Sequence, residues 1–326
     1  MSEVDYRAIH AACDVLQYSG LVAMPTETVY GLAADADNET AVKKIFSAKQ
    51  RPSNHPLIVH ICGEDDLNSW AREVPAQALV LARRFWPGPL TMILKKSDRV
   101  GDWITGGQDS VGLRAPSHPW ARELIKAFAG KTHRGLAAPS ANSFGRISPT
   151  CAKHVMDDLG QKPKGKVDLI LDGGSCDVGV ESTIINLSGE RPEILRHGAV
   201  TRAMLEEALG CAVPDGSANS PRASGTLKSH YAPKTKILLV SDVRACLNEN
   251  SGKRLAVMAT PDSLNQTPKN VLKWFASEQT PEDYARVLYA RLHEMDALGA
   301  DFIVIEQPPR TAQWAAVCDR LDRAAA

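Results

Sequence analysis

The sequence predicts an α/β fold with two domains. Short β-branched runs alternate with stretches of helical periodicity along most of the 326 residues. Near residue 213 the chain becomes rich in Gly, Pro and Ser, and the alternation resumes at 236. We therefore expect a first domain over 1–212, a linker over 213–235 and a small Rossmann-like α/β domain over 236–326. Several strands of the first domain are only a hairpin connection apart, which predicts a mixed sheet.

The elements of the first domain follow from its periodic segments. Apolar residues at helical spacing predict a helix over 6–18, and Asn38 is a suitable cap for a helix through 41–49. Two helical stretches are expected over roughly 64–85, another from His118-Pro119 and another after Ser148-Pro149. About seven strands are expected, at 20–24, 57–61, 91–94, 110–114, 167–172, 182–187 and 192–196.

The small domain begins with an expected strand at 236–240, followed by strands at 254–259 and 301–306. Between the last two, Thr280 caps a helix that has Pro281 in its first turn and that ends at Gly299. A last helix closes the chain. Neither GxGxxG nor GxxxxGK occurs in this domain, so the sequence does not support a dinucleotide or P-loop site there.

Composition narrows the class of protein. The chain has 38 basic and 38 acidic residues, so no bulk attraction to nucleic acid or to an anionic membrane is expected. Its seven cysteines are scattered and never form CxxC, which argues against a disulfide framework or a cysteine zinc site. The polar N-terminus lacks a signal-peptide core, and no apolar run approaches the roughly 20 residues of a membrane span. A cytoplasmic protein without a membrane partner is expected.

Polar side chains gather where apolar strands end, which is where open α/β sheets bind ligands. The first cluster, PTETVYG at 25–31, contains Thr28 and could equally be a capped turn. The second, AKQRPSNHPLIVH at 48–60, favours an anion or phosphate site over a simple helix C-terminus, because an Arg fork matches phosphate oxygens. It supplies Lys49, Arg51, His55 and His60.

Further clusters occur later in the chain. Ser110 and Arg114 bound one strand, and Ser140 lies in the loop APSANS. Ser148-Pro149 has the signature of a helix start, which could cap the helix or bind phosphate. The remaining candidates are Ser182, Arg196 and, in the linker, Tyr231. No GxSxG or HExxH occurs, so the set suits positioning and charge stabilisation in phosphoryl or nucleotidyl transfer rather than covalent catalysis.

Six of these motifs, in this order and spacing, resemble the YrdC-domain family. They are PTETVYGL, AKQRPSNHPLIVHI, SVGLRAPSHP, LAAPSANSFGRISPT, GVESTIINL and ILRHGAV. The linker SGTLKSHYAP and the small domain resemble the long, two-domain form of that family. The resemblance implies a twisted sheet with a concave ligand cleft and the activity of an L-threonylcarbamoyladenylate synthase. Such enzymes join L-threonine, bicarbonate or CO2 and ATP into threonylcarbamoyl-AMP and release pyrophosphate, for N6-threonylcarbamoyladenosine in tRNAs that read ANN codons.

The resemblance also implies roles for the candidates, carried over motif by motif. Lys49 and Arg51 would act by electrostatics. L-Threonine would be held by Thr28, His60, Arg114, the Ala138 backbone and Ser182, and ATP by Arg51, His55, Ser110, Ser140, Ser148, Arg196 and Tyr231. Mg2+ would accompany ATP without assigned protein ligands, and no organic cofactor is expected. The linker 213–235 would act as a lid that keeps water from the labile product.

Other functions remain open at this point. A module that binds RNA without turnover would use Lys43, Lys44, Lys49 and Arg51 on phosphates, although neutral charge and few aromatics argue against it. A nucleotide-sensing regulator and another nucleotide-dependent carbamoyl transferase are further alternatives. If the protein is a synthase, transient contact with tRNA or with a threonylcarbamoyl-transferase complex is possible.

Overall fold

The computed structural model describes residues 3–261 and 268–326, and the chain divides into two compact units. The first unit comprises the chain up to Phe144 together with Pro149–Thr226. The second comprises Gly145–Ser148 and Leu227–Ala326. Residues 213–226 of the expected linker therefore belong to the first unit and residues 227–235 to the second. The limits that we expected for separately folding domains, 1–212 and 236–326, stay a prediction.

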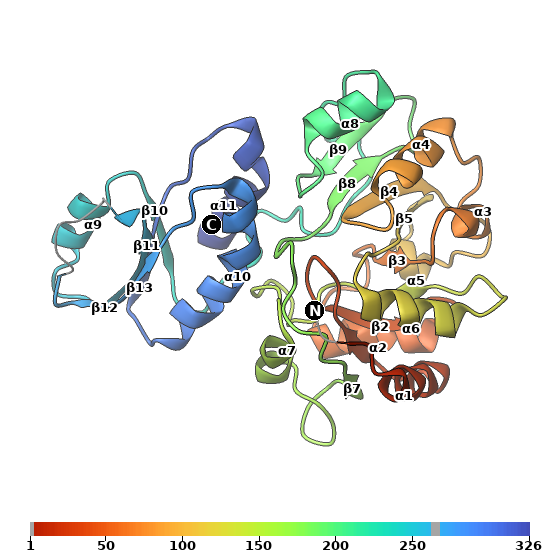
Figure 1. Cartoon of the computed structure of the whole chain (residues 1–326), viewed down its shortest axis with the longest axis horizontal. Helices are drawn as coiled ribbons and strands as arrows, with labels where there is room; N and C mark the ends of the chain where they lie inside the picture. Colours follow the sequence, from red (N-terminus) through yellow and green to blue (C-terminus); the bar gives the residue numbers. More distant parts are fainter. Residues whose placement is uncertain (1–2, 262–267) are drawn as a thin grey trace. The chain divides into compact units, whose positions relative to one another are not determined.

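A mixed sheet forms the centre of the first unit, which confirms the predicted fold class (Figure 1). It has nine strands within the described residues, in the order β7-β1-β2-β6-β3-β5-β4-β8-β9. The strands are β1 Val22–Met24, β2 Gly31–Asp35, β3 Ile58–His60, β4 Leu90–Lys95, β5 Ser110–Arg114, β6 Leu136–Ala137, β7 Leu169–Ile170, β8 Thr183–Asn186 and β9 Glu193–Arg196.

Strands β2 and β6 were not expected from the sequence. The β2 segment GLAAD is rich in alanine, which is depleted in strands, and β6 has only two residues. The antiparallel pairing of β2 with β1 and β6 places both strands in the centre of the sheet. Tertiary pairing therefore overrides local propensity in these two segments.

Helices cover the two faces of this sheet unequally. On one face α1 (Tyr6–Gln17) and α6 (Pro119–Ala129) pack on each other and on β1, β2 and β6 (Figure 1). The other face is covered by the larger core. Its helices are α2 (Glu39–Lys49), α3 (Leu67–Trp70), α4 (Ala76–Phe85), α5 (Asp102–Thr105), α7 (Ala152–Asp158) and α8 (Arg202–Leu209), with the 3-10 turn η1 (Glu64–Asp66). The core formed by α1 and α6 includes no residue of β3, β4, β5 or β8, so these two helices cover only one part of this face.

Two predicted helix starts had different outcomes. His118 caps α6 through its ring Nδ1, with Pro119 in the first turn, as expected. The start expected at Ser148-Pro149 is wrong, because α7 begins at Ala152 with Cys151 at its N-cap. The Pro149 carbonyl instead accepts a 2.8 Å hydrogen bond from the Tyr30 N–H. This bond between distant segments holds the chain extended where local sequence favours a helix.

The second unit contains a parallel four-stranded sheet in the order β10-β13-β11-β12. The strands are β10 Ile237–Val240, β11 Leu255–Ala259, β12 Val271–Ala276 and β13 Phe302–Glu306, and the helices are α9 Val243–Glu249, α10 Pro281–Ala297 and α11 Ala315–Ala325, with the 3-10 turn η3 Ala312–Trp314. Thr280 accepts the capping bond from the Asp283 N–H, and Gly299 after α10 has a φ of +65°, as predicted. The sequence did not indicate α9 and β12.

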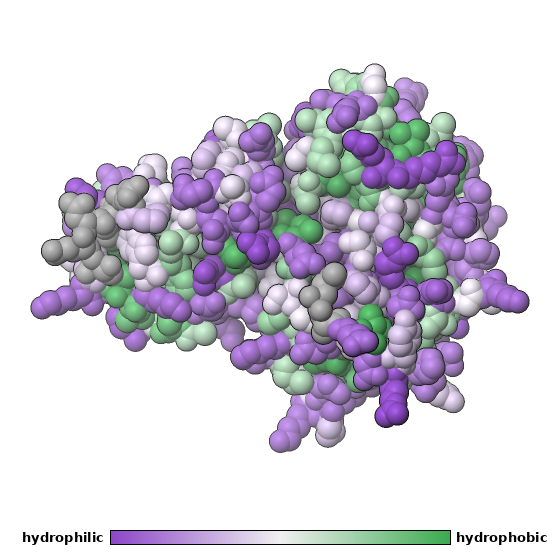
Figure 2. Space-filling view, viewed as in Figure 1, coloured by the Kyte–Doolittle hydropathy of each residue, from purple (hydrophilic) through white to green (hydrophobic). Residues whose placement is uncertain are grey.

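The polarity of the surface and the state of the cysteines can be read from the structure. Figure 2 shows hydrophilic residues spread over the visible surface with smaller apolar areas between them. All seven cysteines are free thiols. Within the described residues, no helix combines the length and the apolar character that a membrane crossing needs.

Candidate functional site

The hairpin loop between β1 and β2 contains the first polar cluster. The Thr26 hydroxyl donates to the Val29 carbonyl at 2.6 Å and accepts from the Thr28 and Val29 N–H groups. Thr28 is fully buried, with its hydroxyl 2.9 Å from that of Thr26. Tyr30 reaches across to donate to the Gly174 carbonyl at 2.7 Å. The loop is therefore a hydrogen-bonded turn, and a ligand-binding role for its buried Thr28 hydroxyl stays a prediction.

Arg114 and His60 end neighbouring parallel strands, β5 and β3, and are register partners. Arg114 is buried, forms a 2.7 Å ion pair with Glu27, and donates from Nε to the Gly88 carbonyl at 3.3 Å. Burial and the adjacent Arg114 charge lower the pKa of His60 to about 3. The site therefore holds a neutral imidazole beside a paired guanidinium.

Lys49, the last residue of α2, points away from solvent. Its ammonium donates to the Ser140 and Asn142 carbonyls, and only 2% of the residue is exposed. Burial, followed by the charge of Arg51, holds the pKa of Lys49 well below its ordinary value. This side chain fastens the APSANS loop to the end of α2.

Arg51 follows the left-handed C-cap of α2 at Gln50, which has a φ of 54°. Its Nη2 donates to the Pro56 carbonyl at 2.9 Å and to the Ser224 hydroxyl at 3.3 Å. The His55 ring lies edge-on to Phe144 with 5.3 Å between the ring centroids. Burial, and then the charge of Arg51, lowers the pKa of His55. This predicted phosphate-binding segment therefore contacts residue 224 of the expected linker.

Ser182, which directly precedes β8, and Arg196, the last residue of β9, form a second buried group. Arg196 donates to the Ser182 carbonyl and hydroxyl, each at 3.0 Å, and to the Ser224 carbonyl at 2.9 Å. The Ser182 hydroxyl is 2.7 Å from that of Thr91 on β4. Arg51 and Arg196 thus contact the same residue, Ser224, through different atoms.

The remaining candidates occupy separate places. Ser110 is buried at the start of β5, and the Ala138 N–H donates to the Ile58 carbonyl at 3.0 Å. Ser148 and Tyr231 belong to the second unit. There, Tyr231 is buried against Tyr289 and Arg320 and has a φ of +62°.

The sheet face between these groups is apolar. Ile93 and Ile184 pack with Ala223, and Ile58 borders them. At Gly112 on β5, a Cβ would lie 3.2–3.5 Å from Ile93, Ile58 and Thr91 side chains, so a side chain there would fill space above the sheet. A flat apolar floor bordered by buried cations and hydroxyls can orient a charged substrate and stabilise developing charge.

Sequence reasoning missed three residues of this site. Glu27 lies in the β1–β2 hairpin loop, but its spacing in the sequence indicates no partner. The sequence indicates only a strand around Thr91, and Ser224 occurs in a stretch whose Ser-rich composition does not single out one residue. The common reason is that each contact joins segments far apart in the chain.

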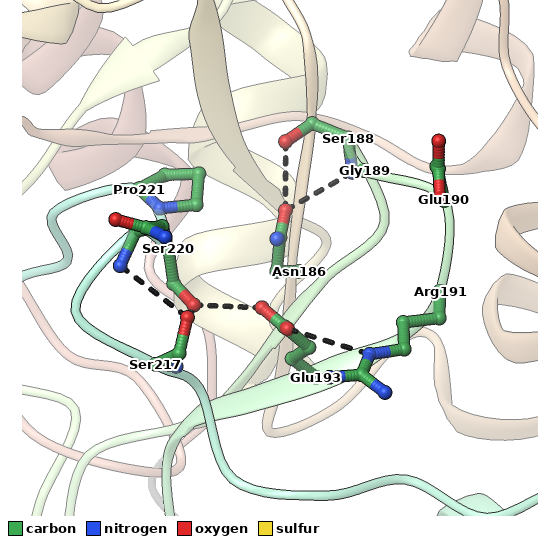
Figure 3. Close-up of a pocket in the computed structure, with 10 residues that line it drawn as sticks. Asn186, Ser188, Gly189, Glu190, Arg191, Glu193, Ser217, Ser220 and Pro221 are labelled. Atoms are coloured by element: carbon green, nitrogen blue, oxygen red, sulfur yellow. Dashed lines mark hydrogen bonds and ion pairs between the residues drawn. The ribbon is translucent and has the colours of Figure 1, made fainter.

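A separate polar groove lies at the hairpin between β8 and β9 (Figure 3). It encloses about 570 Å3 and is lined by Asn186, Ser188, Gly189, Glu190, Arg191, Glu193, Ser217, Asn219, Ser220 and Pro221. Its polar groups bond to one another, as in the 2.7 Å contact from Ser220 to Glu193. None of the candidate residues lines it. Among the described residues, no group of three His, Cys, Asp or Glu side chains could hold a metal ion.

Comparison with known proteins gives matches along almost the whole chain. Residues 14–198 match the family of Sua5, YciO and YrdC proteins described as telomere recombination, and residues 200–326 match the threonylcarbamoyl-AMP synthase C-terminal domain. The threonylcarbamoyl-AMP synthase of Pyrococcus abyssi is 39% identical, with 97% of this chain and 93% of that protein covered. The Bacillus subtilis protein of the same name is 36% identical, with 97% and 92% covered.

A solved structure is also similar over the whole length. The crystal structure of P. abyssi Sua5 complexed with L-threonine has a TM-score of 0.89 and 37% identity. The match covers 99% of this chain and 96% of that one. Both units of this chain therefore have counterparts in one solved protein.

Proposed function

This chain belongs to the family of threonylcarbamoyl-AMP synthases, and we propose from this membership that it forms threonylcarbamoyl-AMP and pyrophosphate from L-threonine, bicarbonate or CO2, and ATP. The observation that carries the proposal is the full-length match to relatives of that name, one solved with L-threonine. The product would serve N6-threonylcarbamoyladenosine formation in tRNAs that read ANN codons.

The proposed threonine site uses groups at the ends of β1, β3, β5 and β8. Arg114 would face the substrate carboxylate, since a guanidinium fork matches it in geometry and charge. Neutral His60, the buried Thr28 hydroxyl, Ser182 and the Ala138 backbone would surround the rest of the amino acid. Support comes from the burial of all five residues in one unit.

The proposed nucleotide site uses Arg51, His55, Ser110, Ser140 and Arg196, with Lys49 holding the Ser140 loop. Arg51 and Lys49 would act on the phosphate charge by electrostatics, and Arg196 would contribute a second guanidinium to the ATP site. The roles of Ser148 and Tyr231 stay predictions from the resemblance. Mg2+ would arrive with ATP, because this ion is usually bound in proteins through substrate phosphates and only one or two carboxylates.

The proposed reaction has two steps. The threonine amine attacks CO2 and loses a proton, which gives a carbamate. A carbamate oxygen then attacks the α-phosphorus of ATP, and the bond to pyrophosphate breaks as the new P–O bond forms. The protein would orient the reactants and stabilise phosphate charge, as expected for a site without a covalent nucleophile.

One assay tests the proposal. The protein is incubated with labelled bicarbonate, L-threonine and ATP, and pyrophosphate and a labelled adenylate are measured. We expect threonine-dependent pyrophosphate in the wild type and none from Arg51→Ala. Arg83→Ala, which removes an exposed arginine paired with Glu64, is the matched control and should keep activity. A wild type that makes no threonine-dependent pyrophosphate would reject the synthase and favour a binding module.

A further inference from the structure

We infer that Glu27 is a positioning residue that fixes the guanidinium of Arg114 for the carboxylate of the amino-acid substrate. This inference rests on the proposed function, because it takes Arg114 as the carboxylate-binding group. Glu27 lies in the β1–β2 hairpin loop, and its position in the sequence does not indicate a role. The structure provides three observations that support the assignment.

The first observation is the ion pair itself. Glu27 Oε1 lies 2.7 Å from Arg114 Nη2, and the two side chains are 6% and 5% exposed. Removing two charges from water costs several kcal/mol per ion before their attraction offsets it, so such a pair is weak evidence for added stability. Because Arg114 lies at a strand end in the proposed threonine site, the pair can instead serve to position its guanidinium.

The second observation is that Glu27 is itself held rigidly. Its Oε2 accepts a 3.1 Å hydrogen bond from the Ser117 N–H, and its carbonyl accepts a 2.8 Å bond from the Val178 N–H. Burial, the largest single effect, would raise the pKa of Glu27, but the Arg114 charge and the hydrogen bonds to the carboxylate together outweigh it, and the pKa lies below its ordinary value. The carboxylate is therefore a fixed negative charge at neutral pH.

The third observation concerns the directions of the Arg114 fork. Nε donates a 3.3 Å hydrogen bond to the Gly88 carbonyl, and Nη2 lies 2.7 Å from Glu27 Oε1 in an ion pair, so contacts with two different loops restrain the guanidinium. Rotation about the side-chain bonds would break one contact or the other. A guanidinium held in this way can meet a carboxylate without losing side-chain freedom on binding.

A purely structural role is the main alternative, and it makes a different prediction. If the pair only stabilised the fold, its loss would resemble the loss of another buried carboxylate pair. Asp35, the last residue of β2, provides the match, since its side chain is also 6% exposed and pairs with Arg134. Asp35 contacts none of the candidate residues through that pair.

The test measures L-threonine affinity by calorimetry on the full chain, together with KM and kcat for pyrophosphate release. We expect Glu27→Gln to weaken threonine binding at least about tenfold, because small misplacement of a binding group has large effects. The KM for ATP should stay within about twofold. Asp35→Asn should leave threonine affinity unchanged.

A double-mutant cycle asks whether Glu27 acts through Arg114. In an Arg114→Gln background, Glu27→Gln should cause no further loss of threonine affinity, whereas independent roles would give additive losses. Unchanged threonine affinity in Glu27→Gln, an equal loss in Asp35→Asn, or additivity in the cycle would each overturn the inference. If Glu27→Gln does not fold, Glu27→Asp replaces it, and wild-type threonine affinity in that variant would overturn the inference.

The outcome is separable from the proposed function. A wild type that binds threonine but releases no pyrophosphate would reject the reaction, while the threonine affinities still decide the role of Glu27. A wild type that does not bind threonine would overturn both.

Discussion

The Arg196 guanidinium holds Ser182 by two hydrogen bonds of 3.0 Å, from Nε to the carbonyl and from Nη2 to the hydroxyl. Its third nitrogen, Nη1, donates to the Ser224 carbonyl at 2.9 Å. Arg196 is itself a proposed ATP-binding residue. It therefore bonds both to Ser182, a proposed threonine-binding residue, and to Ser224, which follows α8 in the chain. Changes at this residue should affect both substrates.

Arg196→Lys should raise the KM values of both L-threonine and ATP, by about tenfold or more. A lysine keeps the charge but cannot donate in three directions from a planar fork, and each charge-assisted hydrogen bond contributes roughly 1.5–3 kcal/mol. Ser182→Ala should raise mainly the KM of threonine. Both values come from initial rates of pyrophosphate release.

Arg202→Lys is the control for this pair of variants. Arg202 forms a 2.7 Å ion pair with Asp215 on the surface, where such pairs contribute little. If Arg196→Lys changed neither KM, or if Arg202→Lys changed both equally, the connecting role of Arg196 would be wrong.

Lys49→Met should lower the free energy of unfolding of the first unit by about 2–3 kcal/mol. The methionine leaves the part-buried Ser140 carbonyl and the buried Asn142 carbonyl without the donor, and unsatisfied buried groups cost about 1–3 kcal/mol each. Urea unfolding of Lys49→Met and of Lys44→Met, whose lysine is exposed, gives the comparison. An unchanged midpoint for Lys49→Met would contradict the assigned role.

Much of this fold could be predicted because its signals are local. Local signals indicate the helix cap at Thr280, Pro119 in a first helical turn and the β-branched strand at 302–306. Strand β2 and the start of α7 depend instead on distant partners. For β2 these are β1 and β6, and for the α7 segment it is Tyr30, which binds the Pro149 carbonyl.

The candidate site shows the same division. Residues with distinctive chemistry at strand ends, such as Arg114 and Arg196, could be chosen from the sequence. Their partners Glu27 and Ser224 could not be chosen. In the sequence, a buried Glu27 looks the same as an exposed glutamate, and Ser224 looks the same as any other serine of the expected linker. Lys49 could be chosen, but its bonds to the backbone of residues 140 and 142 needed the structure.

The lowered pKa of His60 predicts that the free energy of unfolding decreases in acid. Its pKa is about 3 in the folded protein, against about 6.5 when unfolded. The unfolded chain therefore binds more protons below pH 6.5, and stability falls as pH decreases toward 3, by up to about 1.4 kcal/mol per unit from this residue. Above pH 6.5 the contribution is constant.

His60→Gln should flatten this part of the pH profile in chemical unfolding experiments. His10→Gln, which changes an exposed histidine on α1, should leave the slope as in the wild type. Equal slopes between pH 4 and 6 for wild type and His60→Gln would show that the buried imidazole does not remain neutral there.

The expected linker supplies the last prediction, which concerns where the first unit ends. Val213 is fully buried in the main core, Ala223 packs on Ile93 and Ile184, and the Ile194 N–H donates to the Pro214 carbonyl at 2.8 Å. A chain cut after residue 226 should therefore melt several degrees above one cut after 212, since burying one valine side chain contributes about 1.5–3 kcal/mol. Val213→Ala in the longer chain should recover part of the difference. Equal melting temperatures for the two truncated chains would instead place the boundary at 212, as the composition suggested.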